Sequence, residues 1–83
     1  MRDTAQDLVG REAVVNKPFG LGAEDFAYMA QAAPGAMFGL GAAIDDGTIR
    51  NHHTDVFDID ESMLPIGAAI LAETAHRSVC DEL

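Results

Sequence analysis

The densest group of side chains that could do chemistry lies in residues 51–61. It contains two adjacent histidines and several carboxylates: His52, His53, Asp55, Asp58, Asp60 and Glu61. Neutral imidazole and carboxylate are both ligands of zinc and related divalent ions. Neighbouring side chains of an extended segment point to opposite sides, however, so both histidines cannot easily serve one ion. From these residues alone, a metal site is less favoured than a solvated acidic loop that caps the following helix, with Asp58 and Glu61 spaced as in a capping box.

Other polar residues give weaker signals. Glu24 and Asp25 could form an acid/base pair, but carboxylates at the start of a predicted helix more often interact with the helix dipole. His76 lies near a predicted helix C-terminus, where it would make a favourable contact with the dipole. Cys80 has no basic neighbour in sequence closer than Arg77, so a nucleophilic role is not expected. The Gly-Leu-Gly run at 20–22 lacks the third glycine of a dinucleotide-binding fingerprint.

Five elements would have to position these residues. Apolar spacing and breakers predict helices over 2–9, 23–33 and about 62–76. Short β-type runs at 13–16 and 36–42 predict strands, and a tight turn is expected at 45–47. The order α-β-α-β-α predicts an α/β fold, a small layered unit whose two strands are parallel neighbours joined by a right-handed crossover.

The last predicted helix is unusually apolar. With Ser62 as its N-cap, Pro65 falls in the first turn, where proline is tolerated. Its apolar residues form two stripes, one of Leu64, Gly67, Ala68, Leu71 and Ala75, the other of Met63, Ile66 and Ile70. A helix with two apolar stripes should be covered on two sides. That is unusual for a terminal helix in so small a chain and suggests missing partners.

Composition narrows the possible functions. The chain has 83 residues and a formal net charge of −9, which argues against binding to free nucleic acid and to anionic membranes. With 48% hydrophobic residues it is not a disordered acidic tail, and one cysteine excludes a disulfide scaffold. No signal peptide or spanning segment is visible, so a cytoplasmic location is expected. Below roughly 70–80 residues one core rarely supplies more than about 3–5 kcal/mol, and this chain lies just above that length, which suggests a homo-oligomer or a partner subunit.

Three blocks taken together point to a family. They are GAEDFAYM at 22–29, PGAMFGLGA at 34–42 and HHTDVFDIDESMLPIGAAIL at 52–71. In this order and spacing they resemble the C-terminal end of the catalytic domain of zinc-dependent aminoacylase/carboxypeptidase-type metallopeptidases. The likeness is greatest to the amidohydrolase branch, which includes hippurate hydrolase and hydrolases of indole-acetyl amino acid conjugates. Residues 2–16 also resemble the helix and strand that precede these blocks.

The resemblance implies a two-metal site, usually zinc, between a catalytic α/β domain and a smaller lid domain. Such enzymes hydrolyse an amide bond next to a free carboxylate, with a metal-activated water and a glutamate base. The last metal ligand is a histidine in a His-Ser/Thr/Asn-Pro-x-Phe/Tyr-Asp motif. That register falls on His53, and Asp55 stands where proline is usual. His52 would then point away from the metal. The turn containing Gly22 and Glu24 resembles a segment that lines the family's substrate pocket.

The resemblance also implies what residues 1–83 do not contain. The other metal ligands, the glutamate base and the lid domain precede the matching region in the family. We therefore expect a single partial domain with one metal ligand, no catalytic residue, weak zinc binding and no turnover alone. Alternatives are a subunit completed by a separate chain, a non-enzymatic oligomer that serves as a structural module, and a chelator-sensitive metal-binding module.

Overall fold

The computed structural model describes residues 1–16 and 23–81. In order, the elements are three α-helices and two single-turn 3-10 helices: α1 (Arg2–Val9), η1 (Arg11–Ala13), α2 (Phe26–Ala32), η2 (Glu61–Met63) and α3 (Leu64–Val79). The predicted helices at 2–9, 23–33 and about 62–76 are confirmed, with the second shorter at both ends. None of the helices in the described residues is long and apolar enough to cross a membrane.

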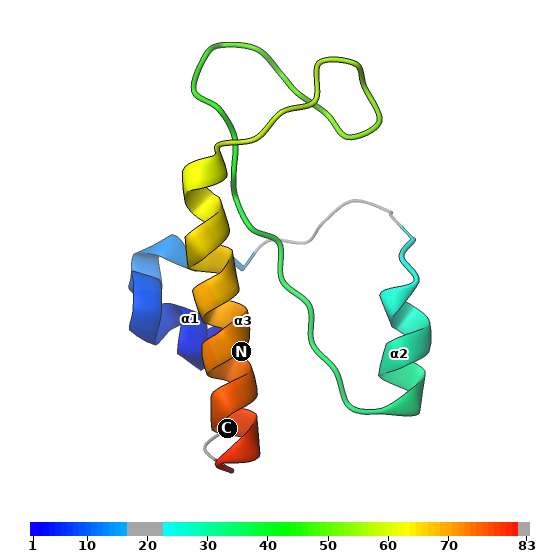
Figure 1. The fold of residues 1–83 in the computed structure, drawn as a ribbon, viewed down its shortest axis with the longest axis vertical. Coiled ribbons are helices and arrows are strands. Elements are labelled where there is room, and N and C mark those ends of the chain that lie inside the picture. Colours follow the sequence, from blue (N-terminus) through cyan, green and yellow to red (C-terminus); the bar gives the residue numbers. More distant parts are fainter. Residues whose placement is uncertain (17–22, 82–83) are drawn as a thin grey trace.

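The predicted α/β fold is wrong. Within residues 1–16 and 23–81 there are helices and connecting segments but no β-strand (Figure 1). The expected first strand begins inside η1, and Val14 after it is extended without a partner strand. Residues 36–42 run as an extended segment, but a strand requires a neighbouring backbone to complete its hydrogen bonds. The described residues supply no such neighbour, so this is a small helical unit rather than a layered sheet.

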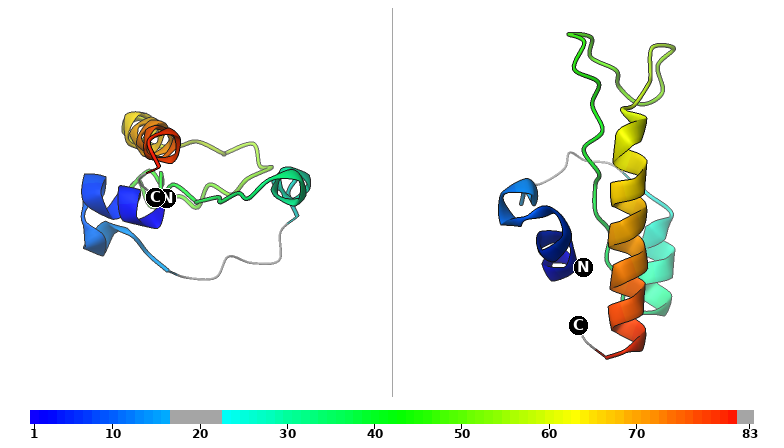
Figure 2. Two further views of the ribbon diagram at one scale, coloured as in Figure 1. Left: turned by 90° about the horizontal axis from the view of Figure 1, so that it is seen from below. Right: turned by 60° about the vertical axis from the view of Figure 1, so that its left-hand side comes forward.

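Helix α3 is the longest element of the described residues, and two other segments lie against it. Helix α1 packs against one side of it, and the extended segment of residues 36–40 follows another side (Figures 1 and 2). Ile70 of α3 is 4% exposed, while Thr4 of α1 is fully buried. Arg77 joins the two helices, because its Nη1 lies 2.7 Å from Asp7 Oδ2 and its Nε donates to Glu73 Oε1 at 3.1 Å. These two hydrogen bonds raise the pKa of Arg77.

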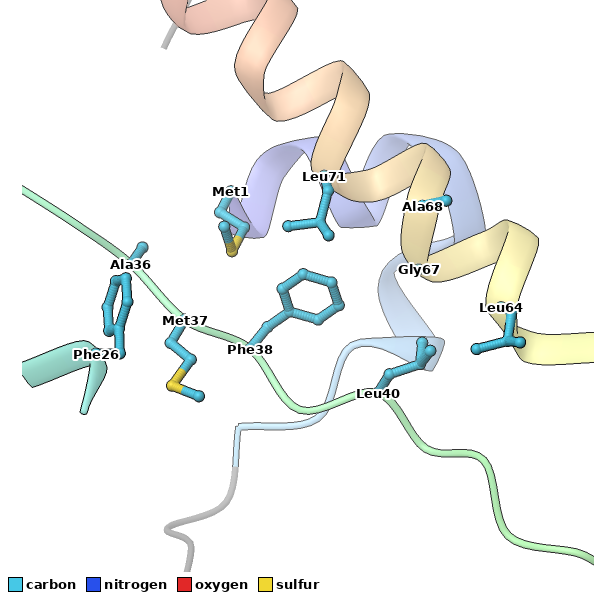
Figure 3. Close-up of a pocket in the computed structure, with 10 residues that line it drawn as sticks. All are labelled: Met1, Phe26, Ala36, Met37, Phe38, Leu40, Leu64, Gly67, Ala68 and Leu71. Carbon is cyan, nitrogen blue, oxygen red and sulfur yellow. The ribbon is translucent and has the colours of Figure 1, made fainter. Parts of the chain in front are cut away.

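The two apolar stripes of α3 have different surroundings. Leu64, Gly67, Ala68 and Leu71 face the extended segment (Figure 3). A Cβ on Gly67 would lie 2.8 Å from Leu40 Cδ2, so only glycine allows this close approach without a shift of Leu40. Leu64 and Leu71 nevertheless stay 52% and 56% exposed. The expected cover on two sides is therefore incomplete within the described residues.

The start of α3 is set by Asp60. Its Oδ1 accepts hydrogen bonds from Ser62 N at 3.0 Å and from Ser62 Oγ at 2.6 Å. Asp60 is thus the N-cap of η2, which leads directly into α3 with Pro65 in the first turn. The prediction that Ser62 is the cap is wrong, since Ser62 donates to the capping carboxylate. The capping box of Asp58 and Glu61 does not form either, because Asp58 Oδ1 accepts from Ile59 N at 2.8 Å.

Because Ile70 is buried, we expect its side chain to contribute more to the free energy of unfolding than the exposed residues of α3. Ile70→Ala should lower the free energy of unfolding by about 2–4 kcal/mol, because it leaves a cavity at a buried position. Leu71→Ala is the matched control on the next residue and should cost at most about 1 kcal/mol, because Leu71 is half exposed. Urea unfolding followed by helical circular dichroism measures both. Equal losses would contradict this packing of α3.

Candidate functional site

The histidine pair lies in a long loop at the N-terminal end of α3. Residues 42–60 leave the extended segment, project beyond the helix and return to it (Figure 1). Asp60 N donates to Ala42 O at 2.8 Å, which closes the base of the loop. The same Asp60 caps the helical turn that follows. Both ends of the loop are therefore fixed to the start of α3.

Arg50 joins two distant parts of this loop. Its Nη2 lies 2.6 Å from Asp46 Oδ2, and its Nη1 donates to Val56 O at 2.8 Å. Asp46 Oδ1 also accepts from Thr48 N at 3.0 Å, and Gly47 has φ 77°, so the predicted turn at 45–47 is present. The hydrogen bond from Arg50, followed by that from Thr48, lowers the pKa of Asp46.

His53 occupies a turn with unusual backbone geometry. Its φ is 64°, in the left-handed region that residues with a Cβ rarely adopt. Thr54 Oγ1 donates to Asn51 O at 2.7 Å, and Phe57 N donates to Thr54 O at 3.3 Å on the other side of the histidine. The His53 side chain is exposed. The imidazole is thus presented at the surface of a hydrogen-bonded turn.

The two imidazoles do not converge. Their ring centroids lie 6.4 Å apart with planes inclined at 68°. The His52 ring instead lies against Phe57, with 5.2 Å between centroids. This arrangement suits the expectation that only one of the two histidines serves a given ion.

The donors in the described residues fall short of a complete metal site. His53 is chemically suited to zinc as an exposed imidazole. A catalytic zinc needs about three protein ligands, and residues 1–16 and 23–81 contain no group of three His, Cys, Asp or Glu side chains that could hold an ion. His53 by itself therefore does not make a metal site in the described part of the chain.

Of the other two predicted site residues, Gly22 and Glu24, only Glu24 lies in the described part of the chain. Gly22 lies outside the described residues. Glu24 stands just before α2, where its Oε2 accepts from Phe26 N at 2.6 Å. This is the interaction with a helix start that the sequence favoured for Glu24. Helix α2 lies well away from the loop that carries His53 (Figures 1 and 2).

Sequence reasoning missed two contacts. Arg50 received no role, although opposite charges at 46 and 50 were a weak signal for an ion pair. Cys80 was judged to have no basic neighbour closer than Arg77, but its Sγ lies 3.6 Å from His76 Nε2. The i, i+4 spacing of His76 and Cys80 on the last helix was the available signal. Both side chains are exposed.

An open apolar hollow of about 500 Å³ lies beside α3 (Figure 3). Phe38 and Leu40 of the extended segment face Leu64 and Leu71 of the helix across it. Its lining residues carry no acid, base or metal ligand on their side chains, so it offers packing surface rather than reactive groups.

A model of Peptidase family M20/M25/M40 matches residues 1–77, which include this loop and most of α3. The chain belongs to this family. The resemblance drawn from the three sequence blocks is thereby confirmed. The family is generally metal-dependent.

Curated relatives narrow the likeness to amide hydrolases. Two proteins of Arabidopsis thaliana, IAA-amino acid hydrolase ILR1-like 6 and ILR1-like 2, are each 36% identical over 77 and 74 residues. The matches cover 92% and 89% of this chain, and 17% of each relative. Putative amidohydrolase YhaA of Bacillus subtilis (strain 168) is 36% identical over 73 residues, 87% of this chain and 18% of the relative. The chain thus spans less than a fifth of these relatives. No solved structure matches it.

The Asp60 cap predicts a pH response at the base of the loop. Hydrogen bonds from the Ser62 side chain and backbone lower the pKa of Asp60. A depressed carboxyl pKa stabilises the folded state above the ordinary aspartate pKa of about 3.9, and this contribution is lost as the pH falls through the lower folded value. The Ser62 amide resonance should therefore titrate with a midpoint below the ordinary aspartate value.

Asp60→Asn is the matched control for this titration. Asparagine also caps helices but does not titrate, so the Ser62 amide should lose this transition while α3 keeps its start. Proton–nitrogen correlation spectra collected between pH 6 and pH 2 give the curve. A wild-type midpoint at or above the ordinary aspartate value would contradict the Asp60 cap.

Proposed function

We propose that this chain is the C-terminal part of the catalytic domain of a metal-dependent amidohydrolase that hydrolyses N-acyl amino acids or related amides. The observation that carries the proposal is the family match over residues 1–77, in register with the three sequence blocks. Relatives named as amino acid conjugate hydrolases and as an amidohydrolase support the substrate class.

His53 would supply one metal ligand of the complete enzyme. Its exposed imidazole is accessible to an ion. The loop that carries it is closed at the start of α3 by the hydrogen bond from Asp60 N to Ala42 O. A neutral imidazole nitrogen is a normal zinc ligand, and zinc is the metal we propose. When bound, the metal would polarise the scissile carbonyl and lower the pKa of a water. Asp55 takes the place of the motif's usual proline, so hydrogen bonds must fix this loop where proline would have restricted it.

The remaining parts of the site would come from outside these 83 residues. The described residues contain no group of three ligands that could hold an ion, and we propose that the other ligands and the general base belong to the rest of the domain. That remainder could precede this segment in one polypeptide or be a separate complementing chain. From the family resemblance, we also propose that Gly22 and Glu24 line the substrate pocket. No catalytic residue is proposed within this chain.

A chimeric enzyme tests this proposal. The segment of Putative amidohydrolase YhaA that aligns with this chain would be replaced by residues 1–83, and hydrolysis of N-acetyl and N-benzoyl amino acids measured with zinc. We expect a metal-dependent amidase activity in the chimera and none in the 83-residue chain alone. His53→Ala should lower kcat/KM by at least about a hundredfold, because loss of a ligand exceeds the tenfold to hundredfold effect of outer contacts.

His52→Ala is the matched control, since its ring lies on Phe57 rather than beside His53. It should retain most of the chimera's activity. Equal loss in both histidine variants would contradict the assignment of His53, and an inactive but folded chimera would contradict the function. Metal-dependent hydrolysis by the isolated chain would show that the site is complete after all.

A non-enzymatic oligomer is the second candidate function, favoured by the exposure of Leu64 and Leu71 on α3. Large exposed apolar patches mark interaction surfaces. This alternative predicts a defined oligomer by analytical ultracentrifugation, converted to monomer by Leu71→Glu but not by Val79→Glu at the 87% exposed end of the same helix. A wild-type chain that sediments as a stable monomer would exclude this alternative.

A further inference from the structure

One side chain holds the loop that carries His53. The Arg50 guanidinium reaches Asp46 Oδ2 with Nη2, at 2.6 Å, and the carbonyl oxygen of Val56 with Nη1, at 2.8 Å. The two acceptors are ten residues apart, one on each side of Arg50. The hydrogen bond to Val56 closes the segment 50–56 around His53. Without this link, the turn around His53 would keep only its short-range hydrogen bonds, from Thr54 to Asn51 O and from Phe57 to Thr54 O.

The shape of arginine is required for this link. A guanidinium carries donors in a rigid planar fork and can serve two acceptors in different directions, whereas lysine presents a compact point charge. The Arg50 side chain is only 26% exposed although the loop around it is open. Asp46 and Asp58 both favour its charged form. Arg50 is therefore a fixed, charged crosslink rather than a mobile surface side chain.

The backbone of His53 is the part of the loop that most needs such a crosslink. A left-handed φ of 64° is disfavoured for any residue with a Cβ and persists only where the surroundings impose it. Packing does not impose it, because the His53 side chain is exposed. The hydrogen bonds that flank the turn are those of Thr54 to Asn51 O and of Phe57 to Thr54 O. Arg50 closes the larger ring outside them.

We propose that Arg50 is a positioning residue for the His53 imidazole. By joining Asp46 to Val56 it holds the 50–56 turn in the conformation that directs the ring toward the metal site. It acts through the backbone and touches neither metal nor substrate. The claim about loop order rests on the geometry of this chain alone, and the claim about metal rests on the proposed function.

The first test is made on the 83-residue chain without metal. Heteronuclear nuclear Overhauser effects should show residues 51–57 nearly as ordered as α3 in the wild type. Arg50→Met and Arg50→Lys should both lower the order of this turn and leave α3 unchanged. Arg77→Met is the matched control, because it removes the arginine that joins α1 to α3 and should leave residues 51–57 as they are. Unchanged order in Arg50→Met would overturn the proposal.

The second test uses the chimera described above. Arg50→Met should weaken zinc binding by about tenfold to hundredfold, the range typical of groups that orient a metal ligand. Activity should return at saturating zinc, because His53 is still present. Zinc that binds the folded state also stabilises it, so a folding defect is excluded by equal thermal unfolding midpoints of the wild-type and Arg50→Met chimeras without zinc. Arg77→Met should bind zinc as the wild type does. Loss of activity that zinc cannot restore would overturn the positioning role.

The two tests separate the proposals. An inactive chimera with the wild-type segment would refute the proposed function, while the order of residues 51–57 would still decide whether Arg50 holds the loop. An active chimera whose zinc affinity is unchanged by Arg50→Met would refute the positioning role alone.

Discussion

The contact of Leu40 with Gly67 helps to hold the extended segment against α3. A Cβ on Gly67 would lie 2.8 Å from Leu40 Cδ2, so glycine lets the Leu40 side chain lie against the helix without a shift. Two residues further on, Ala42 O accepts from Asp60 N, and Asp60 caps the turn that leads into α3. Both ends of the His53 loop are thus attached at the same end of α3. A larger residue at 67 would first have to displace the flexible end of the Leu40 side chain.

Signals from neighbouring residues predicted the helices correctly. The predicted sheet was wrong, because strand pairing depends on contacts between distant residues that a local pattern does not show. Helix α1 ends where Gly10 takes a φ of 90°, and α3 begins with Pro65 in its first turn, both readable from nearby residues. Residues 36–42 do run extended, as their composition suggested. A strand, however, is defined by a second backbone, and within the described residues only the bond from Asp60 to Ala42 reaches this segment. Extended conformation was therefore predictable, and pairing was not.

In the candidate site, too, some features could be predicted from the sequence and others could not. The register of the motif singled out His53 because it depends on residue types alone. Its φ of 64° was not foreseeable, since Gly, Asn and Asp are the usual occupants of that conformation. The link from Arg50 to Val56 O also escaped prediction, because a backbone carbonyl is an acceptor at every position and gives no sequence signal. The contact of Glu24 with the start of α2 was predictable, because carboxylates commonly occupy this place before a helix.

The incomplete metal site and the incomplete core have a common explanation in the proposed enzyme. Leu64 lines the apolar hollow and also lies at the end of α3 from which the His53 loop projects. A body that covered the hollow would therefore rest against the same end of the helix as the loop. The chain spans less than a fifth of its curated relatives, so most of such a protein is available to form that body. If His53 ligates a metal as proposed, binding of that metal and burial of the exposed leucines would both require this body.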